Sequence, residues 1–343
     1  MTEAASQAFK EQIKYDIDRF SPEDAEHLPS LFRKIYGDHY LTDQVYDPAA
    51  FRRANADGSC QSLIARNDHG LPVGHLGIVQ SAPYTGVREL GQGVVDPGHR
   101  TQGLLGQLID RCVDVSDRDP TCCGLFGAAL TNHVFSQRAL WKADFVDVGF
   151  EIGFVPARMM QIEATGAGPT ATVLQYRAMD DAPAQVSYLP SAYSDLMLAL
   201  YDQLHLTRAF ATSDQPLDHA GTSQIEVVDL PRFDLVRINV RRIGADLPAR
   251  VAAATADARR NRRTMVQLAL ALGSPCTDAA VEAMREAGFW FGALLPRWMD
   301  QDALLMQRAI GEPWFGGVEL FTNDAKALLR YVQQDAARQP VLA

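Results

Sequence analysis

The sequence predicts an α/β fold in two domains, each a twisted mixed sheet with helices on both faces. Its 343 residues exceed the usual size of a single domain. Strand-length apolar runs alternate with helical patterns along the chain, and the plan of the first half partly recurs in the second. We therefore expect a first domain over residues 1–163, a linker over residues 164–184 and a second domain over residues 185–343.

The first half follows the order β-α-α-β-β-β-α-β-α-β. Residues 13–20 alternate in polarity as a half-buried strand does, and Ser21-Pro22-Glu23-Asp24 has the composition of a helix start. Asp68-His69-Gly70 suits a hairpin turn. The expected strands lie at 13–20, 61–67, 71–81, 89–95, 125–130 and 145–154, and the expected helices start after residues 20 and 48 and span 103–117 and 135–143.

The second half is expected to repeat a related plan after the Gly- and Ala-rich stretch ATGAGPTA, residues 164–171. Thr277-Asp278 has the composition of a helix cap. The expected strands lie at 185–189, 223–228, 235–240, 264–270 and 290–295, and the expected helices at 192–206, 251–262, 279–287 and 324–337. This order indicates a duplication.

The composition excludes several classes of protein. Hydrophobic residues make up 47% of the chain and charged residues 22%, and the formal net charge is -10, which argues against a nucleic-acid binder. No apolar run reaches the length of a membrane helix, and the N-terminus does not resemble a signal peptide. The five cysteines form no CxxC pair, so we expect reduced thiols, no metal site and a cytoplasmic location.

The most informative stretch is GQGVVDPGHRTQGLLGQLID, residues 91–110, where a strand breaks at a turn and a helix follows. A helix N-terminus offers unpaired N–H groups and a partial positive charge, so phosphate binds well there. Gly103 would let a phosphate approach the backbone, and Arg100 adds a cationic fork. The stretch lacks both the GxGxxG fingerprint and the end of a P-loop. Taken alone, it fits either a plain connection or a phosphate cradle.

In its context, this stretch resembles the acyl-coenzyme A site of the GCN5-related N-acetyltransferase superfamily. That family carries an Arg/Gln-x-x-Gly-x-Gly/Ala turn after its fourth strand, and this sequence has RTQGLL at residues 100–105, followed by Gly106. A strand, a polar corner and a helix ending near Phe145 follow in the family's order. The sequence departs from the pattern at Leu105, Asp144 and Leu140, where the family has a small residue, a glycine and a tyrosine.

The resemblance covers the first half, and the second half resembles a degenerate repeat of the same fold. It implies direct transfer of an acyl group, acetyl or longer, from acyl-coenzyme A to a primary amine of a small metabolite or peptide. Two strands would part around the pantetheine, and a backbone N–H would face the developing oxyanion. The implied coenzyme A contacts are Gly93, Val94, Val95, His99, Arg100, Thr101, Gln102, Gly103, Leu104, Leu105 and Gly106.

Three residues are candidates for proton transfer. Glu89 starts the strand beside the implied gap, where many family members place a base, although a strand-end carboxylate on the surface fits as well. His133 follows the strand at 125–130 and could serve as base or acid, or as a polar corner residue. Ser136 could bond the cofactor or relay a proton, or make a local backbone hydrogen bond.

The acceptor pocket is expected from the first helices and their loop. Tyr36, Tyr40 and Tyr46 could form aromatic walls for an amine, or could simply cover the core. Two other classes of function remain open. The chain could be a catalytically silent sensor or module that binds acyl-coenzyme A, or an unrelated α/β enzyme with a phosphate-binding turn.

Overall fold

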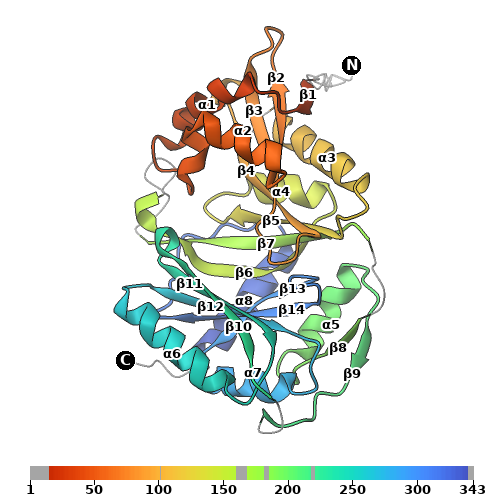
Figure 1. Cartoon of the computed structure of the whole chain (residues 1–343), viewed down its shortest axis with the longest axis vertical. Coiled ribbons are helices and arrows are strands. Elements are labelled where there is room, and N and C mark those ends of the chain that lie inside the picture. Colours follow the sequence, from red (N-terminus) through yellow and green to blue (C-terminus); the bar gives the residue numbers. More distant parts are fainter. Residues whose placement is uncertain (1–14, 101, 160–167, 181–184, 218–220, 339–343) are drawn as a thin grey trace, which may run out of the picture.

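A single mixed sheet of 12 strands runs through both halves of the chain in this computed structural model (Figure 1). The structure describes residues 15–100, 102–159, 168–180, 185–217 and 221–338. The strands are β1 (Asp16–Arg19), β2 (Cys60–Arg66), β3 (Pro72–Val79), β4 (Val87–Val95), β5 (Gly124–Leu130), β6 (Val146–Val155), β7 (Thr170–Ala178), β8 (Val186–Tyr188), β9 (Ala209–Ala211), β10 (Gln224–Leu230), β11 (Leu235–Arg242), β12 (Met265–Ala271), β13 (Trp290–Leu295) and β14 (Ala303–Ala309). The α-helices are α1 (Leu28–Tyr36), α2 (Pro48–Asp57), α3 (Leu104–Asp117), α4 (Phe135–Lys142), α5 (Ser194–Gln203), α6 (Leu247–Arg260), α7 (Thr277–Glu286) and α8 (Asn323–Ala337).

The large sheet has the order β1-β2-β3-β4-β5-β7-β6-β13-β14-β12-β11-β10. The N-terminal elements lie at one end of the molecule and the C-terminal elements at the other, with β5, β7 and β6 between them (Figure 1). The strands β6 and β13 join the two halves through an antiparallel pairing of Gly149 with Ala293. Strands β8 and β9 form a separate two-stranded sheet.

The two halves repeat one strand order. In the first half, β3 and β4 pair antiparallel, β4 and β5 pair parallel across α3, and β7 lies between β5 and β6. In the second half, β10 and β11 pair antiparallel, β11 and β12 pair parallel across α6, and β14 lies between β12 and β13. The strand order is therefore shared by the two halves, and the duplication that the sequence indicated stays a prediction.

The helices form where an apolar stripe coincides with good end signals. Helix α1 turns Leu28, Leu31, Phe32 and Ile35 toward the sheet. Helix α2 is capped by the Asp47 side chain, which accepts a hydrogen bond of 2.8 Å from the amide of Ala49. Most predicted helices and strands of the first half are therefore present within a few residues of their expected bounds. Residues 13 and 14 of the first predicted strand lie outside the described residues.

The predicted linker over residues 164–184 is wrong at residues 170–178, because these form β7. This strand pairs with β5 over residues 172–178 and with β6 on its other side. The six side chains from Ala171 to Tyr176 are buried, so it is an interior strand. The division into two domains stays a prediction, since one sheet runs through both halves. The second half also contains β14, which the sequence analysis did not identify.

The cysteines lie in the interior of the protein. All five are buried and unpaired, as expected from their spacing. No helix in the described part of the chain has the length and apolar character that crossing a membrane requires. Among the described residues, no group of three or more His, Cys, Asp and Glu side chains is arranged to hold a metal ion.

Candidate active site

Strands β4 and β5 start as a parallel pair and then part. Their pairing is confined to Val87 with Gly124, Arg88 with Leu125 and Glu89 with Phe126. Beyond these positions β4 stays with β3 and β5 stays with β7, so the two strands no longer bond to each other. The separation leaves the facing backbone N–H and C=O groups of both strands without their ladder partners. An extended group that can form hydrogen bonds could fill such a gap by strand addition.

A bulge in β4 lies at the point where the strands part. Gln92 has a φ of 56°, and the register with β3 shifts between His75 and Gly77. A positive φ at a residue other than glycine is uncommon and needs support from its surroundings. The bulge turns the backbone of β4 away from a regular ladder, which redirects the peptide groups at the start of the gap.

The support for the bulge comes from the buried His75. Its Nδ1 lies 2.8 Å from the carbonyl oxygen of Gln92, and its Nε2 lies 3.0 Å from Oγ of Ser62. Burial lowers the pKa of His75 to about 4, so the ring is neutral at physiological pH. Because a carbonyl can only accept, Nδ1 carries the proton and Nε2 accepts from the serine hydroxyl. Asn55 Nδ2 donates to the same Ser62 hydroxyl at 3.1 Å, which completes a buried polar chain behind the bulge.

The turn between β4 and α3 has the features of an anion site. Gly103 has a φ of 76° and starts α3, a conformation that favours glycine. The first helical bond runs from the amide of Gln107 to Gly103 at 3.1 Å, so the amides of residues 104–106 precede the hydrogen-bonded part of the helix. A Cβ built on Gly106 would meet nothing within 4 Å, so the helix start is open to the outside.

The remaining residues of the turn are held by neighbouring elements. The hydroxyl of Tyr15 contacts both Nδ1 of His99, at 3.2 Å, and the Gln102 side chain. Arg100 is exposed, and its Nε lies 3.4 Å from the carbonyl of Val95. Thr101 lies outside the described residues. The described residues among the implied coenzyme A contacts, 93–95, 99, 100 and 102–106, thus lie at the end of β4 and in the turn and helix start that follow it, and their role stays a prediction.

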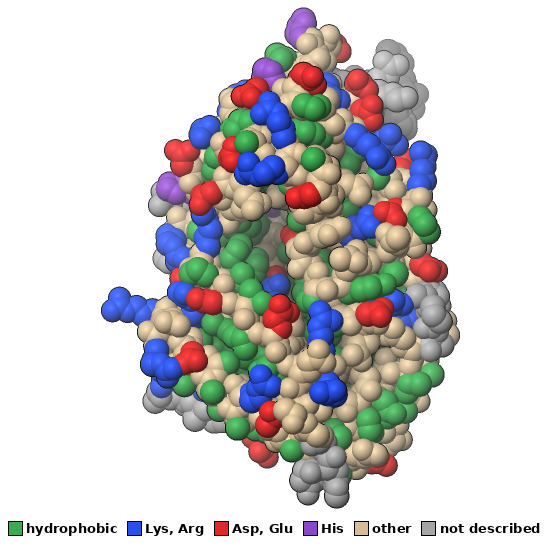
Figure 2. Space-filling view, viewed as in Figure 1, with side chains coloured by type: hydrophobic (Ala, Val, Ile, Leu, Met, Phe, Trp, Pro, Cys, Tyr) green, Lys and Arg blue, Asp and Glu red, His purple; other side chains and the backbone are tan. Residues whose placement is uncertain are grey.

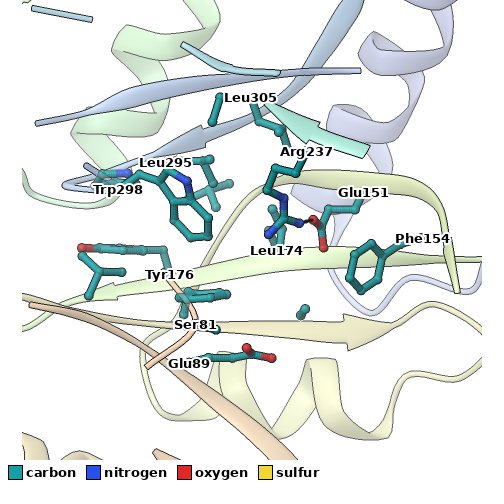
Figure 3. A pocket seen from close by; sticks show the side chains of 16 residues that line it. Ser81, Glu89, Glu151, Phe154, Leu174, Tyr176, Arg237, Leu295, Trp298 and Leu305 are labelled. Atoms are coloured by element: carbon teal, nitrogen blue, oxygen red, sulfur yellow. Dashed lines mark hydrogen bonds and ion pairs between the residues drawn. The ribbon is translucent and has the colours of Figure 1, made fainter. Parts of the chain in front are cut away.

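A pocket lies at the inner end of the gap, between the two halves of the chain. The space-filling view shows the molecule hollowed between its N-terminal and C-terminal parts, with hydrophobic side chains along the hollow (Figure 2). The pocket (Figure 3) is lined by Ser81, Val87, Glu89, Phe126, Ala128, Val148, Glu151, Phe154, Leu174, Tyr176, Arg237, Ala269, Leu295, Pro296, Trp298 and Leu305.

Equivalent positions of the two repeats face each other across this pocket. Glu89 pairs with Phe126 in the first half, and Arg237 pairs with Gln267 at the same step of the second. Two residues further on, Ala128 pairs with Leu174 and Ala269 pairs with Leu305, and all four line the pocket. At this step of the two repeats, the first half therefore presents a carboxylate to the pocket and the second half presents a guanidinium.

Glu89 provides the carboxylate on the floor of the pocket. Desolvation raises its pKa above the ordinary value of 4.5, the nearby Glu151 adds to the rise, and Ser81 and Arg237 oppose it. A carboxylate with a raised pKa is a better proton acceptor once ionised. The structure places this predicted residue in a largely apolar pocket next to the parting strands.

A second group of polar side chains closes the pocket from the other side. Arg237 donates from Nη2 to Oε1 of Glu151 at 2.5 Å and from Nε to Oε1 of Gln267 at 2.9 Å. Gln267 Nε2 donates to Glu151 at 3.1 Å, and Thr172 donates to the other carboxylate oxygen at 3.1 Å. Glu151 thus accepts hydrogen bonds from three side chains and forms an ion pair with Arg237.

The other predicted site residues lie elsewhere. His133 and Ser136 are not among the residues that line the pocket. Tyr40 is buried in a cluster with residues of α1 and α2, and Tyr36 and Tyr46 pack against it. The Tyr46 hydroxyl accepts a hydrogen bond of 2.9 Å from the amide of Tyr40. These contacts match the alternative in which the tyrosines cover the core.

Sequence reasoning did not identify Glu151 or Arg237 as pocket residues, whereas it allowed Trp298 to belong either to the core or to the wall of the cleft. One signal was available, because Arg237 and Glu151 each stand between two apolar residues in a strand, and charged residues are rarely buried unless they are paired.

The comparisons with known proteins give structural similarities only. No protein-family model and no curated protein matches the chain. An N-acetyltransferase from Staphylococcus aureus Mu50 is 13% identical, with a TM-score of 0.42, over 49% of this chain and 100% of that one. A GNAT superfamily phosphinothricin acetyltransferase from Sinorhizobium meliloti, in complex with AcCoA, is 14% identical, with a TM-score of 0.41, over 50% and 91%.

A third solved structure is the ribosomal-protein-S5-alanine acetyltransferase from Vibrio fischeri. It is 12% identical to this chain, with a TM-score of 0.39, and the match covers 48% of this chain and 93% of that one. The chain is thus similar to solved N-acetyltransferases over about half of its length, and at such scores the functional inference rests on the site itself.

Proposed function

We propose that the protein is an N-acyltransferase that moves an acyl group, acetyl or longer, from acyl-coenzyme A to an amine. The observation that carries this proposal is the parting of β4 and β5 between an open helix N-terminus and a pocket that contains Glu89. Three parts of an acyl-coenzyme A molecule have suitable partners here: the pyrophosphate, the pantetheine and the thioester.

The outer part is a pyrophosphate, for which the amides of residues 104–106 and the guanidinium of Arg100 are suitable partners. The middle part is the pantetheine, whose amide groups could pair with the backbone edges exposed between β4 and β5. The open space at Gly106 and the positive φ of Gly103 support this fit, because both leave the backbone accessible.

The reactive part is the thioester, which would lie near the β4 bulge. A backbone N–H of residues 93–95 is in the right region to stabilise the oxyanion that forms when the amine attacks the carbonyl carbon. The amine would occupy the pocket, and Glu89 would accept its proton directly or through water. The C–S bond then breaks, and coenzyme A leaves as a thiolate that takes up a proton.

The family pattern has a tyrosine that protonates the leaving thiolate, and this chain has no tyrosine at that position. Leu140 stands at that position, is buried and packs against the backbone of Gly127. His133 and Ser136 remain proposed proton donors, and water is the alternative.

The test is an assay of thiol release from acetyl-coenzyme A and longer acyl-coenzyme A with a panel of amines. We expect release that depends on the amine, together with saturable coenzyme A binding. Arg100→Ala is expected to weaken binding by about tenfold or more. The matched control is Arg118→Ala, at the opposite end of α3. Tight binding without turnover on any amine would instead favour a silent acyl-coenzyme A-binding module.

A further inference from the structure

The wall of the pocket that faces Glu89 comes from the C-terminal half. Arg237 and Trp298 lie on one side of the pocket, and Glu89 and Ser81 lie on the other (Figure 3). Glu89 and Arg237 occupy the same step of the two repeats, as the third residue of β4 and of β11. The two halves thus supply charges of opposite sign at the two ends of one cavity.

Arg237 is a fixed cation with unused hydrogen-bonding capacity. Its Nε and Nη2 bond to Gln267 and Glu151, which sets the plane of the guanidinium. Within the described parts of the chain, its Nη1 makes no hydrogen bond, although a guanidinium carries five N–H donors. Its side chain is 19% exposed, whereas the Glu151 side chain is 6% exposed. The guanidinium therefore faces the open space, and the carboxylate that orients it lies behind.

The surrounding surface is apolar and aromatic. The centre of the Arg237 guanidinium lies 5.8 Å from the centroid of the Trp298 ring, and Trp298 contacts Phe126 edge-on, with centroids 5.4 Å apart. Phe154 and Tyr176 complete the aromatic lining. A ligand that fits this pocket has an apolar body with polar groups at opposite ends.

We propose that the acceptor is an amine that also carries a carboxylate, with its amine at Glu89, its carboxylate at Nη1 of Arg237 and its apolar body against Trp298. This inference rests on the proposed acyl transfer, and it goes further by naming the class of acceptor. Glu89 would receive the proton of the ammonium group, and Arg237 would hold the carboxylate by charge-assisted hydrogen bonds.

The test compares matched ligands with and without a carboxylate. Suitable pairs are phenylalanine with phenethylamine, and 6-aminohexanoate with hexylamine, each titrated calorimetrically into the protein saturated with coenzyme A. We expect at least one carboxylate-bearing member to bind roughly tenfold or more tightly than its partner. The same pairs are then compared by kcat/KM in the thiol-release assay.

The variant Arg237→Lys keeps a positive charge beside Glu151 but loses the planar fork. It is expected to reduce the preference for the carboxylate to about threefold or less, while binding of the amine without a carboxylate changes little. A ratio of two affinities measured on one variant does not depend on how much of the protein is folded. Arg242→Lys, at the exposed end of the same strand, is the control and should leave the preference unchanged.

Two results would overturn the inference: equal or weaker binding of every carboxylate-bearing ligand, or a preference that survives in Arg237→Lys. Both are binding results, so they are distinct from a failure of the proposed function, which would be an absence of thiol release. A carboxylate preference in binding that Arg237→Lys removes supports the inference whether or not turnover follows.

Discussion

The parallel pair β4–β5 in the first half and the parallel pair β11–β12 in the second occupy the same place in the two repeats, yet one is open and the other closed. The first pair bonds at three positions and then parts, whereas the second bonds at six consecutive positions from Leu235–Met265 to Val240–Leu270. A closed ladder leaves no backbone edge for a ligand. The same strand order therefore produces a candidate cofactor gap in one half and a plain wall in the other.

The turns that follow the two strands differ in the same sense. In the first half, the turn is long enough to contain Gly103 and leads to an open helix start. In the second half, Gly244 is pressed against the backbone near Ser223, and the Asp246 side chain accepts a hydrogen bond of 2.7 Å from the Ser223 amide. Because Asp246 brings a negative charge to the start of α6, this turn is unsuited to phosphate. The second half thus contributes side chains to the pocket and no cradle.

The largest effect is expected from removing the charge of Glu89, which lies in the half whose parallel strands part. Glu89→Gln removes the proposed base, and we expect kcat to fall by about 100-fold or more with little change in acyl-coenzyme A binding. In the unmodified protein, kcat/KM should decline as pH falls through the pKa of Glu89, which is raised above 4.5 by burial, since the protonated acid cannot accept the proton. Steady-state rates against pH measure both effects. Glu286→Gln on the exposed end of α7 is the control, and an undiminished rate in Glu89→Gln would exclude the role.

The second-largest effect is expected from a carboxylate added at the start of α3, compared with the same change at the start of α6. Gly106→Asp places a carboxylate at the third residue of α3, where there is space for it, and should weaken coenzyme A binding by about 30- to 100-fold through repulsion of the phosphates. Ala249→Asp makes the same change at the third residue of α6 and should have no effect on binding. An acidic group in the first turn is compatible with helix stability, so both variants should fold. Equal losses in the two variants would mean that the halves do not differ as described.

A smaller effect concerns the histidine that supports the open strand. The folded-state pKa of His75 is about 4, below the ordinary value of 6.5, so the unfolded chain binds a proton first as pH falls. The stability contribution is complete above pH 6.5 and is lost toward pH 4, and it amounts to roughly 3 kcal/mol. Chemical unfolding between pH 7 and pH 4 measures it. His75→Gln should flatten this dependence, and an unchanged slope in that variant would assign the loss to other groups.

The smallest effect is expected at a surface contact between the second half and the first. Arg232 lies in the turn between β10 and β11, pairs with Asp43 and donates to the Tyr40 carbonyl at 3.2 Å. Exposed ion pairs contribute little, so Arg232→Ala should leave thermal stability almost unchanged and raise the amine KM by about threefold at most. Asp43→Ala should behave alike. A large loss in either variant would show that this contact, rather than the pocket wall, couples the two halves.

The sequence was sufficient to predict most elements of the first half, because alternation and helix-start signals are local. It failed at residues 170–178. The Gly- and Ala-rich run at residues 164–171 indicated a linker, although the residues that follow form an apolar stretch. The sequence predicts Glu89 at the start of a strand beside the expected gap. In the structure, Glu89 lines a pocket at this place. Arg237 could not be assigned to the same pocket, since it comes from the other half and meets Glu89 only through the tertiary arrangement.

The structure shows the surroundings of Leu140 and Asp144, two residues at which the sequence departs from the family pattern. Leu140 packs against Gly127, where a Cβ would come within 2.7 Å of the leucine side chain, so this position serves the core. Asp144 has a φ of 61°, a left-handed conformation that favours glycine and that aspartate can adopt. Asp144 therefore keeps a backbone conformation that glycine favours, whereas Leu140 supplies an apolar side chain to the core.

The most direct measurement is a crystal structure of the protein with a non-hydrolysable acyl-coenzyme A analogue. The account predicts one molecule per chain, with its pyrophosphate on the amides of residues 104–106, its pantetheine between β4 and β5, and its acyl end at the pocket that contains Glu89. A coenzyme A molecule at the start of α6, or one bound away from the gap with β4 and β5 unoccupied, would contradict it.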